Sequence, residues 1–261
     1  MKTRIITAIV LIALILPCVI IGQIPFQLMI AALAAGGVFE MLSICDRPKA
    51  NIYLYPLVGI FMFYSLFLEH AFFIPTEIIL LYMIALLTCS MFDDGMNFTR
   101  VCYYFTAGVL IAMGFHILYQ LRMNYGINYL IIIALATFGT DTGAYFTGMF
   151  FGKHKLNPRL SPKKTIEGSL GGMLLGTVLS VAYGAYIQID IPLVFFVMTC
   201  LILTVTGQIG DLTFSSIKRT FEVKDYSQLF PGHGGVLDRF DSLLFNAMVL
   251  GVLLHFIALV V

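Results

Sequence analysis

The sequence has few charged residues: only 11% of its 261 residues are Asp, Glu, Lys or Arg, whereas about a quarter is usual for soluble domains. Hydrophobic residues make up 60% of the chain, against roughly 45–50% in soluble domains. The net charge of +1 offers no bulk charge to attract nucleic acid, so we expect no nucleic-acid partner. This composition excludes a water-soluble enzyme and predicts a membrane protein with several spans.

Several patterns that carry familiar chemistry are also absent. The five cysteines are far apart and form no C-x-x-C pair, which argues against a zinc site or a disulfide framework. The G-x-x-x-x-G-K-[ST] phosphate loop, the G-x-S-x-G nucleophile motif and the H-E-x-x-H zinc motif do not occur. Any chemistry in this chain must therefore use other residues.

Long apolar runs dominate what is present. A helix needs about 20 apolar residues to cross the hydrocarbon core of a bilayer, and nine runs are candidates: 5–22, 26–45, 52–68, 75–91, 101–121, 127–150, 167–188, 191–210 and 242–261. No small-residue cleavage site follows the first run, so we expect it to be a retained helix rather than a signal peptide. The third and fourth runs are short, and a tilted or partly re-entrant hairpin is the alternative there.

The basic residues predict the orientation of these spans. With a cytoplasmic N-terminus, 14 of the 15 fall on cytoplasmic segments and only Arg122 falls outside. The cytoplasmic residues are Lys2, Arg4, Arg47, Lys49, Arg100, Lys153, Lys155, Arg159, Lys163, Lys164, Lys218, Arg219, Lys224 and Arg239. This asymmetry follows the positive-inside rule. We predict an all-α, polytopic integral membrane protein of about nine transmembrane helices, with its N-terminus cytoplasmic and Val261 outside.

Polar residues are concentrated in the second half of the chain. Two long polar stretches, 152–166 and 211–240, hold nine of the basic residues, and both are predicted to be cytoplasmic loops. We therefore divide the chain into N-terminal scaffold helices, 1–122, and a C-terminal catalytic transmembrane domain, 123–261.

Small residues recur every fourth position in the seventh run: Gly168, Gly172, Gly176, Ser180 and Gly184. Such a face lets another helix approach closely in lipid. We favour packing within the chain, and a dimer seam is the alternative.

Asp141 lies well inside the sixth run, beside Thr140, Thr142 and Gly143. A carboxylate in mid-helix costs about 2.5–3.5 kcal/mol on insertion scales, and such residues usually line a polar cavity. We favour a functional role for Asp141, the alternative being a position close enough to the interface to be hydrated.

Three further acids, Asp211, Asp238 and Asp241, lie at the ends of the last two runs. If the chain is helical from Asp238 onward, the spacing of three places Asp238 and Asp241 on one face. A cluster of the three would repel itself, and Mg²⁺ would relieve that repulsion by binding carboxylates together with substrate phosphates. Helix capping explains one such aspartate but not three beside many basic residues.

The same region supplies groups that bind phosphate. Lys218 and Arg219 follow Ser215 and Ser216, and His233-Gly234-Gly235 offers backbone N–H groups for close approach. Acidic side chains that bind a metal ion, together with basic side chains that bind phosphate, are typical of enzymes that transfer phosphoryl or nucleotidyl groups. The residues alone therefore indicate metal-dependent phosphate chemistry at the cytoplasmic surface of a membrane.

At these positions the sequence resembles the phosphatidate cytidylyltransferases (CDP-diacylglycerol synthases). The family signature S-x-[apolar]-K-R-x₄-K-D-x-[small]-x₂-[apolar]-[small or P]-x-H-G-G-[apolar]-x-D-R-[apolar]-D is filled throughout 215–241. Its positions are Ser215, Lys218, Arg219, Lys224, Asp225, Ser227, Phe230, Pro231, His233, Gly234, Gly235, Asp238, Arg239 and Asp241. A second similar block comprises 141–145, 151–156 and 161–168. Met149 departs from the family, in which a basic residue often follows the glycine at 148.

The resemblance implies transfer of CMP from CTP to phosphatidate, for phospholipid synthesis. Asp211, Asp238 and Asp241 would hold Mg²⁺, and a second cation such as K⁺ is also implied. The residues expected to grip the CTP phosphates are Lys218, Arg219, Lys224, His233 and Arg239, and the signature adds Asp225 to the catalytic set. The residues expected to contact nucleotide or lipid headgroup are Asp141, Ser161, Lys163, Lys164, Thr165, Ser215, Gly234 and Gly235. We expect a multi-pass protein of the bacterial inner membrane, with its active site facing the cytoplasm, and a homodimer is consistent with the family.

Rival functions explain less of the sequence. A CTP-dependent polyprenol or lipid kinase would act on a neutral alcohol and need a base, and the complete signature favours the cytidylyltransferase. An ion-coupled secondary transporter would account for Asp141 and Asp211 but not for the signature. The D-G…A-R…G…D…D array of CDP-alcohol phosphotransferases is absent, and a purely structural bundle would not concentrate its charges in two loops.

Overall fold

The structure is a computed structural model that describes residues 2–45, 52–68 and 71–260, with the side chains of 2–5 and 259–260 left aside. The chain forms two compact units. One comprises Met1–Met123 and Asp225–Arg239, and the other comprises Asn124–Lys224 and Phe240–Val261. Arg47 and Lys49, which count toward the predicted orientation, lie outside the described residues.

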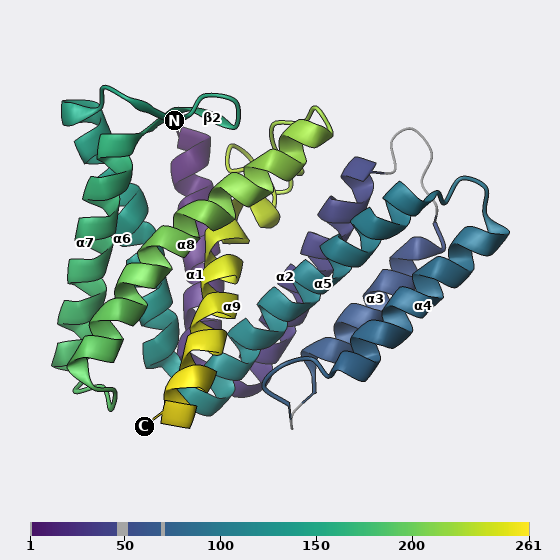
Figure 1. Cartoon of the computed structure of the whole chain (residues 1–261), viewed down its shortest axis with the longest axis horizontal. Helices are drawn as coiled ribbons and strands as arrows, with labels where there is room; N and C mark the ends of the chain where they lie inside the picture. The colour runs from purple at the N-terminus through teal and green to yellow at the C-terminus, as the bar shows by residue number, and fades with distance from the viewer. Residues whose placement is uncertain (1, 46–51, 69–70, 261) are drawn as a thin grey trace. The chain divides into compact units, whose positions relative to one another are not determined.

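Among the described residues, the first unit contains five α-helices and the start of a π-helical turn that ends in the second unit. They are α1 (Lys2–Ile21), α2 (Gln23–Cys45), α3 (Leu54–Leu66), α4 (Thr76–Phe92), α5 (Phe98–Gln120) and the turn Leu121–Tyr125. Gly22, with φ +73°, provides the break between α1 and α2. The Asn97 side chain accepts a hydrogen bond from Arg100 N at 2.9 Å and so caps the start of α5. Figure 1 shows α3 and α4 as neighbouring helices, and α5 contacts α2, α3 and α4.

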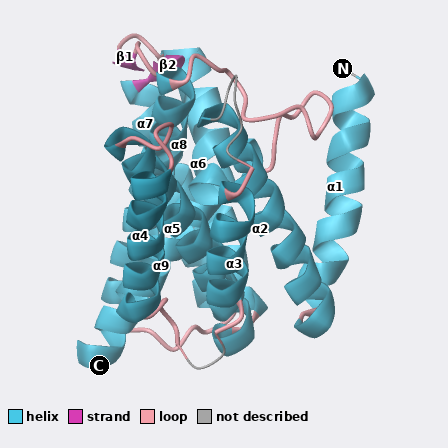
Figure 2. Ribbon diagram, turned by 90° about the vertical axis from the view of Figure 1, so that its right-hand side faces the viewer, coloured by secondary structure: helices cyan, strands magenta, loops and turns pink. Residues whose placement is uncertain are grey.

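The second unit contains most of the polar residues of interest. Its elements are α6 (Ile127–Phe151), β1 (Lys155–Asn157), β2 (Ser161–Thr165), α7 (Ile166–Tyr186), α8 (Leu193–Thr220) and α9 (Leu237–Val260), whose first residues belong to the first unit. β1 and β2 pair antiparallel, and Figure 2 shows this hairpin at one end of α6 and α7. The unit therefore combines a helical body with a small polar β-hairpin.

The glycine stripe on α7 packs against helices of the same chain. Gly168, Gly172, Gly176, Ser180 and Gly184 are all buried, and α6 and α7 lie side by side (Figure 1). A Cβ on Gly172 would lie 2.5 Å from Thr140 O, and one on Gly184 would lie 2.1 Å from the Phe196 ring. The prediction of packing within the chain is confirmed, because small residues let the backbones approach closely.

The helices agree with the predicted apolar runs and confirm an all-α, polytopic membrane protein. Among the described residues, six helices are long and apolar enough to cross a membrane: Gln23–Cys45, Phe98–Tyr125, Ile127–Phe151, Ile166–Tyr186, Leu193–Thr220 and Leu237–Ala258. Three shorter apolar helices, Ile6–Ile21, Leu54–Leu66 and Thr76–Phe92, match the remaining predicted spans. Leu170, Leu174 and Val178 are exposed on α7, away from its glycine face, as expected for a helix with one side in lipid.

Two polar segments differ from the expected loops. Helix α8 continues through Asp211 to Thr220, ten residues beyond the predicted end of its span. Hydropathy marks only the apolar part of a helix, and Lys218 and Arg219 in the last turn favour its C-terminus electrostatically. The stretch 152–166 contains the β-hairpin rather than irregular chain. α9 begins at Leu237, so the condition under which Asp238 and Asp241 share one helix face is met.

Candidate active site

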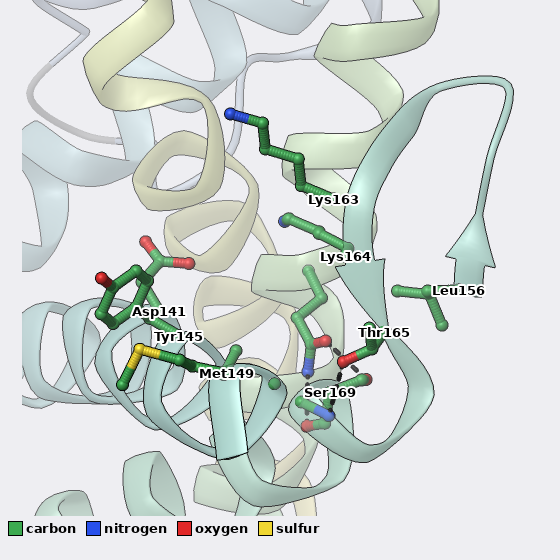
Figure 3. A pocket seen from close by; sticks show the side chains of 12 residues that line it. Asp141, Tyr145, Met149, Leu156, Lys163, Lys164, Thr165 and Ser169 are labelled. Carbon is green, nitrogen blue, oxygen red and sulfur yellow. Dashed lines mark hydrogen bonds between the residues drawn. The ribbon is translucent and has the colours of Figure 1, made fainter. Parts of the chain in front are cut away.

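A cavity of about 360 Å³ opens in the second unit among α6, the hairpin, α7 and α8. It is lined by Asp141, Ala144, Tyr145, Gly148, Met149, Leu156, Lys163, Lys164, Thr165, Gly168, Ser169 and Gln208. Figure 3 shows Asp141, Tyr145 and Met149 on one side and Lys163, Lys164 and Thr165 on the other. Asp141 lines this cavity together with Lys163, Lys164 and Thr165 of the second sequence block, and its functional role stays a prediction.

The hairpin is tied firmly to the start of α7. Thr165 caps α7 by accepting a hydrogen bond from Gly168 N at 3.1 Å. Glu167 accepts hydrogen bonds from the backbone N–H groups of Lys153 and His154 at 3.1 and 3.2 Å, and it pairs with His154 Nδ1 at 2.5 Å. These bonds tie residues 153 and 154, which precede the hairpin, to Glu167 in the first turn of α7. Lys163 and Lys164 are thereby held at the cavity rather than left on a flexible loop.

Lys164 forms an ion pair with Asp211, so the hairpin reaches α8. Both side chains are partly buried, with 29% and 27% of their surface exposed. At that exposure a charge pair is less screened than a typical surface salt bridge. One of the predicted metal ligands is thus neutralised by a predicted headgroup-binding lysine.

Asp241 is the most buried of the predicted acids, with 9% of its surface exposed. It accepts a hydrogen bond from Ser242 N at 2.7 Å. Asp211 and Asp141 lie close enough to repel its charge, and Lys218 lies close enough to attract it. The charges of Asp141, Asp211 and Lys218 therefore all act on Asp241, so these four predicted residues of the second unit lie near one another.

No three His, Cys, Asp or Glu side chains in the described parts of the chain form a ready-made metal site. Mg²⁺ commonly takes one or two carboxylates and completes its coordination with water and substrate phosphates. Asp211 and Asp241 suit that mode, since they are oxygen donors of like charge within electrostatic range of each other. The role of Asp238 as a third ligand stays a prediction.

The signature loop, residues 225–236, belongs to the first unit together with the first turn of α9. Oδ2 of Asp238 accepts hydrogen bonds from Tyr226 N at 2.8 Å and from Gly235 N at 2.9 Å. Gly234 has φ +85°, and a Cβ there would lie 2.7 Å from Asp238 Oδ2. Glycine at 234 therefore lets the chain fold closely around this carboxylate.

The predicted phosphate-binding residues divide between the two units. Arg219 is exposed at the end of α8, where its Nη1 donates to Val223 O at 3.1 Å, and Arg239 Nε donates to His233 O at 2.7 Å. His233 Nδ1 is buried and has no hydrogen-bond partner among the described residues, which is unusual for a buried polar atom unless a ligand or water satisfies it.

The remaining predicted residues do not line the cavity. Lys218 is buried on α8, whereas Lys224 and Asp225 are exposed in the turn after α8. Ser161 and Ser215 are half-buried at the start of β2 and on α8.

Sequence reasoning missed several polar residues of the site. Ser169 and Gln208 line the cavity and are joined by a hydrogen bond of 2.6 Å. Glu40 is almost fully buried on α2 and accepts hydrogen bonds from the signature loop. It is a lone acid within the apolar run 26–45, so the rule that drew attention to Asp141, an ionisable residue inside a span, would also have identified Glu40.

Comparison with known proteins covers nearly the whole chain. A sequence model described as "Cytidylyltransferase family" matches residues 2–257. A phosphatidate cytidylyltransferase of Bacillus subtilis (strain 168) is 36% identical over 255 residues, which is 94% of each chain. A phosphatidate cytidylyltransferase of Staphylococcus haemolyticus (strain JCSC1435) is 31% identical over 97% of this chain and 99% of its own. One of Staphylococcus aureus (strain COL) is 42% identical over 144 residues, 55% of each chain.

Proposed function

The chain belongs to the cytidylyltransferase family, and from this premise we propose that it is a phosphatidate cytidylyltransferase, an enzyme that forms CDP-diacylglycerol and pyrophosphate from CTP and phosphatidate. The structural observation that carries the proposal is the cavity in which Lys163, Lys164 and Asp141 come together. Its lining combines cations for phosphate oxygens with apolar side chains such as Met149 and Leu156. A phospholipid headgroup with attached acyl chains has this mixture of charge and apolar surface.

The reaction needs little acid–base chemistry from the protein. A phosphate oxygen of phosphatidate attacks the α-phosphorus of CTP, a new P–O bond forms, and the bond to the bridging oxygen of pyrophosphate breaks with its electron pair. A phosphomonoester has a second pKa near 6, so at pH 7 its oxygen is already a nucleophile. The barrier lies in bringing two anions together and stabilising the charge on the leaving pyrophosphate.

The basic side chains lower that barrier by supplying positive charge. Lys163 and Lys164 hold phosphate at the cavity, and Lys164 moves between Asp211 and substrate oxygens as these bind. We propose that Lys218, Arg219 and Lys224 contact the CTP phosphates, and the family signature predicts the same role for His233 and Arg239. Charge-assisted hydrogen bonds of this kind are about twice as strong as neutral ones.

Asp211 and Asp241 would hold Mg²⁺, with Asp238 as the further predicted ligand and a second cation such as K⁺ as part of the same proposal. Bound there, Mg²⁺ supplies charge that neutralises phosphate oxygens. The like charges of Asp211 and Asp241 support this assignment, because a bound cation would offset both carboxylates once Lys164 leaves Asp211 for the substrate.

We place the active site at the cytoplasmic face of a bacterial inner membrane. The distribution of basic residues and the cytosolic origin of CTP support this orientation. A homodimer is a separate part of the proposal. The glycine stripe gives it no support, since that stripe is buried within the chain.

The test is pyrophosphate release by the purified protein in detergent with CTP, Mg²⁺ and phosphatidate. We expect release to require phosphatidate, to yield CDP-diacylglycerol, and to be abolished by Asp238→Asn. Parallel reactions omit the lipid or replace it with diacylglycerol or a polyprenol. A phosphorylated product from an alcohol lipid would instead identify a lipid kinase. If the folded protein gives no product in any of these reactions, the alternative of an ion-coupled secondary transporter is favoured.

A further inference from the structure

Glu40 connects the first transmembrane helices to the signature loop. Its side chain is 1% exposed on α2, and three donors surround it. Oε1 accepts hydrogen bonds from Ser227 Oγ at 2.6 Å and from Val236 N at 2.8 Å, and Oε2 accepts one from Leu237 N at 2.9 Å. All four residues belong to the first unit.

These contacts explain how a carboxylate is tolerated inside an apolar helix. A buried carboxylate is strongly destabilising unless hydrogen bonds satisfy its oxygens. Two of the three donors are backbone N–H groups at the start of α9, where the helix dipole also favours negative charge. Glu40 thus caps the start of α9, although it precedes Leu237 by 197 positions in the sequence.

The same contacts fix both ends of the segment 227–237. That segment contains His233, Gly234 and Gly235, and the next residue is Asp238, whose carboxylate holds the loop from its inner side. A Cβ on Gly235 would lie 2.3 Å from Glu40 Oε1, so the loop passes directly over the Glu40 carboxylate.

We propose that Glu40 is a positioning residue for the cytidylyltransferase reaction: it holds the signature loop so that His233, Asp238 and Arg239 present the geometry that CTP requires. The inference rests on the proposed function, in which this loop contacts the nucleotide. Glu40 itself acts through the loop and not on the substrate.

The first experiment compares Glu40→Gln with Glu77→Gln, an exposed glutamate in the first turn of α4. Glutamine retains the shape of glutamate but replaces one accepting oxygen with an NH₂ group that faces a backbone N–H. We expect E40Q to raise the KM for CTP at least about tenfold, with the KM for phosphatidate changed less than twofold and E77Q equal to wild type. Ser227→Ala, which removes one donor, should change the KM for CTP in the same direction by a smaller factor.

A double-mutant cycle tests the contact itself. Gly235→Ala should impair wild type because its methyl group meets the Glu40 carboxylate. In a Glu40→Ala background that carboxylate is gone, so adding G235A should lower kcat/KM for CTP by a smaller factor than it does in wild type. Such non-additivity is the mark of a direct interaction.

The outcomes separate the two proposals. If wild type makes no CDP-diacylglycerol, the proposed function fails. If wild type is active but E40Q leaves the KM for CTP unchanged and reduces only the yield of folded enzyme, Glu40 is merely structural and the inference is overturned. Full additivity of E40A and G235A would overturn it as well.

Discussion

At the scale of single residues, the ion pair between Lys164 and Asp211 couples two parts of the site that the sequence separates by 47 positions. Each charge is the other's partner in a partly buried setting. Removing one partner leaves the other charge poorly solvated. The resulting loss of stability is larger than the stabilisation that the ion pair itself contributes. Binding of phosphate at Lys164 would release Asp211, so the two events should be linked.

Lys164→Gln should lower kcat/KM for phosphatidate by about tenfold or more, because hydrogen bonds to charged groups are worth about 1.5–3 kcal/mol and each 1.4 kcal/mol is a factor of ten. Lys155→Gln is the matched control, since Lys155 is exposed on β1 of the same hairpin and does not line the cavity. Steady-state kinetics with varied phosphatidate measures both variants. Equal losses in K164Q and K155Q would mean that only the net charge of the hairpin matters.

At the scale of elements, the close approach of α6 and α7 depends on positions where no side chain fits. Gly172 contacts the backbone of α6 at Thr140, so a methyl group there can be accommodated only by moving a helix. Cores packed at this density resist added volume. The hairpin and its cavity are built on the ends of these two helices, so their spacing also sets the width of the site.

Gly172→Ala should destabilise the protein by about 1–3 kcal/mol, the usual cost of overpacking, and lower its Tm by several degrees. Gly59→Ala on α3 is the control, because a Cβ there has no neighbour within 4 Å. Alanine in a helix interior is favoured over glycine by about 0.5–1 kcal/mol, so G59A should leave Tm unchanged or raise it slightly. Thermal unfolding in detergent measures both, and an unchanged Tm for G172A would contradict the packing described here.

At the scale of the whole molecule, the signature loop is grouped with the first five helices although α8 and most of α9 belong to the second unit. The N-terminal helices are therefore more than a membrane anchor, because Glu40 on α2 holds the loop that carries the family signature. A fragment 123–261, the predicted catalytic domain, would lack this support.

The proposed orientation predicts opposite accessibility for two engineered cysteines in a cysteine-free variant that retains turnover. Pro158→Cys, in the turn between β1 and β2, should react with a membrane-impermeant maleimide only from the cytoplasmic side. Asn124→Cys, beside Arg122 and exposed in the turn before α6, should react only from the outside. The positive-inside distribution is the reason for this expectation. Labelling of both positions from one side would contradict the nine-span topology.

Much of the fold could be predicted because a bilayer imposes simple rules on sequence. Runs of about 20 apolar residues identified the helices, and the stripe from Gly168 to Gly184 identified a close-packed face. The start of α9 at Leu237 was only a condition for Asp238 and Asp241 to share a face, since the apolar run itself begins at 242. The end of α8 at Thr220 was not predicted either, because polar residues extend a helix beyond the membrane as readily as they end it.

The family, the helical class and most of the candidate residues were determined by the sequence itself, through local composition and a motif of fixed spacing. The tertiary structure alone decided that Lys164 pairs with Asp211, that Asp141 shares a cavity with the hairpin, and that Glu40 holds the signature loop. These arrangements join residues 15 to 197 positions apart in the sequence. No local pattern encodes such partners, because a buried charge specifies only that it must be satisfied, and the packing of the helices determines which groups satisfy it.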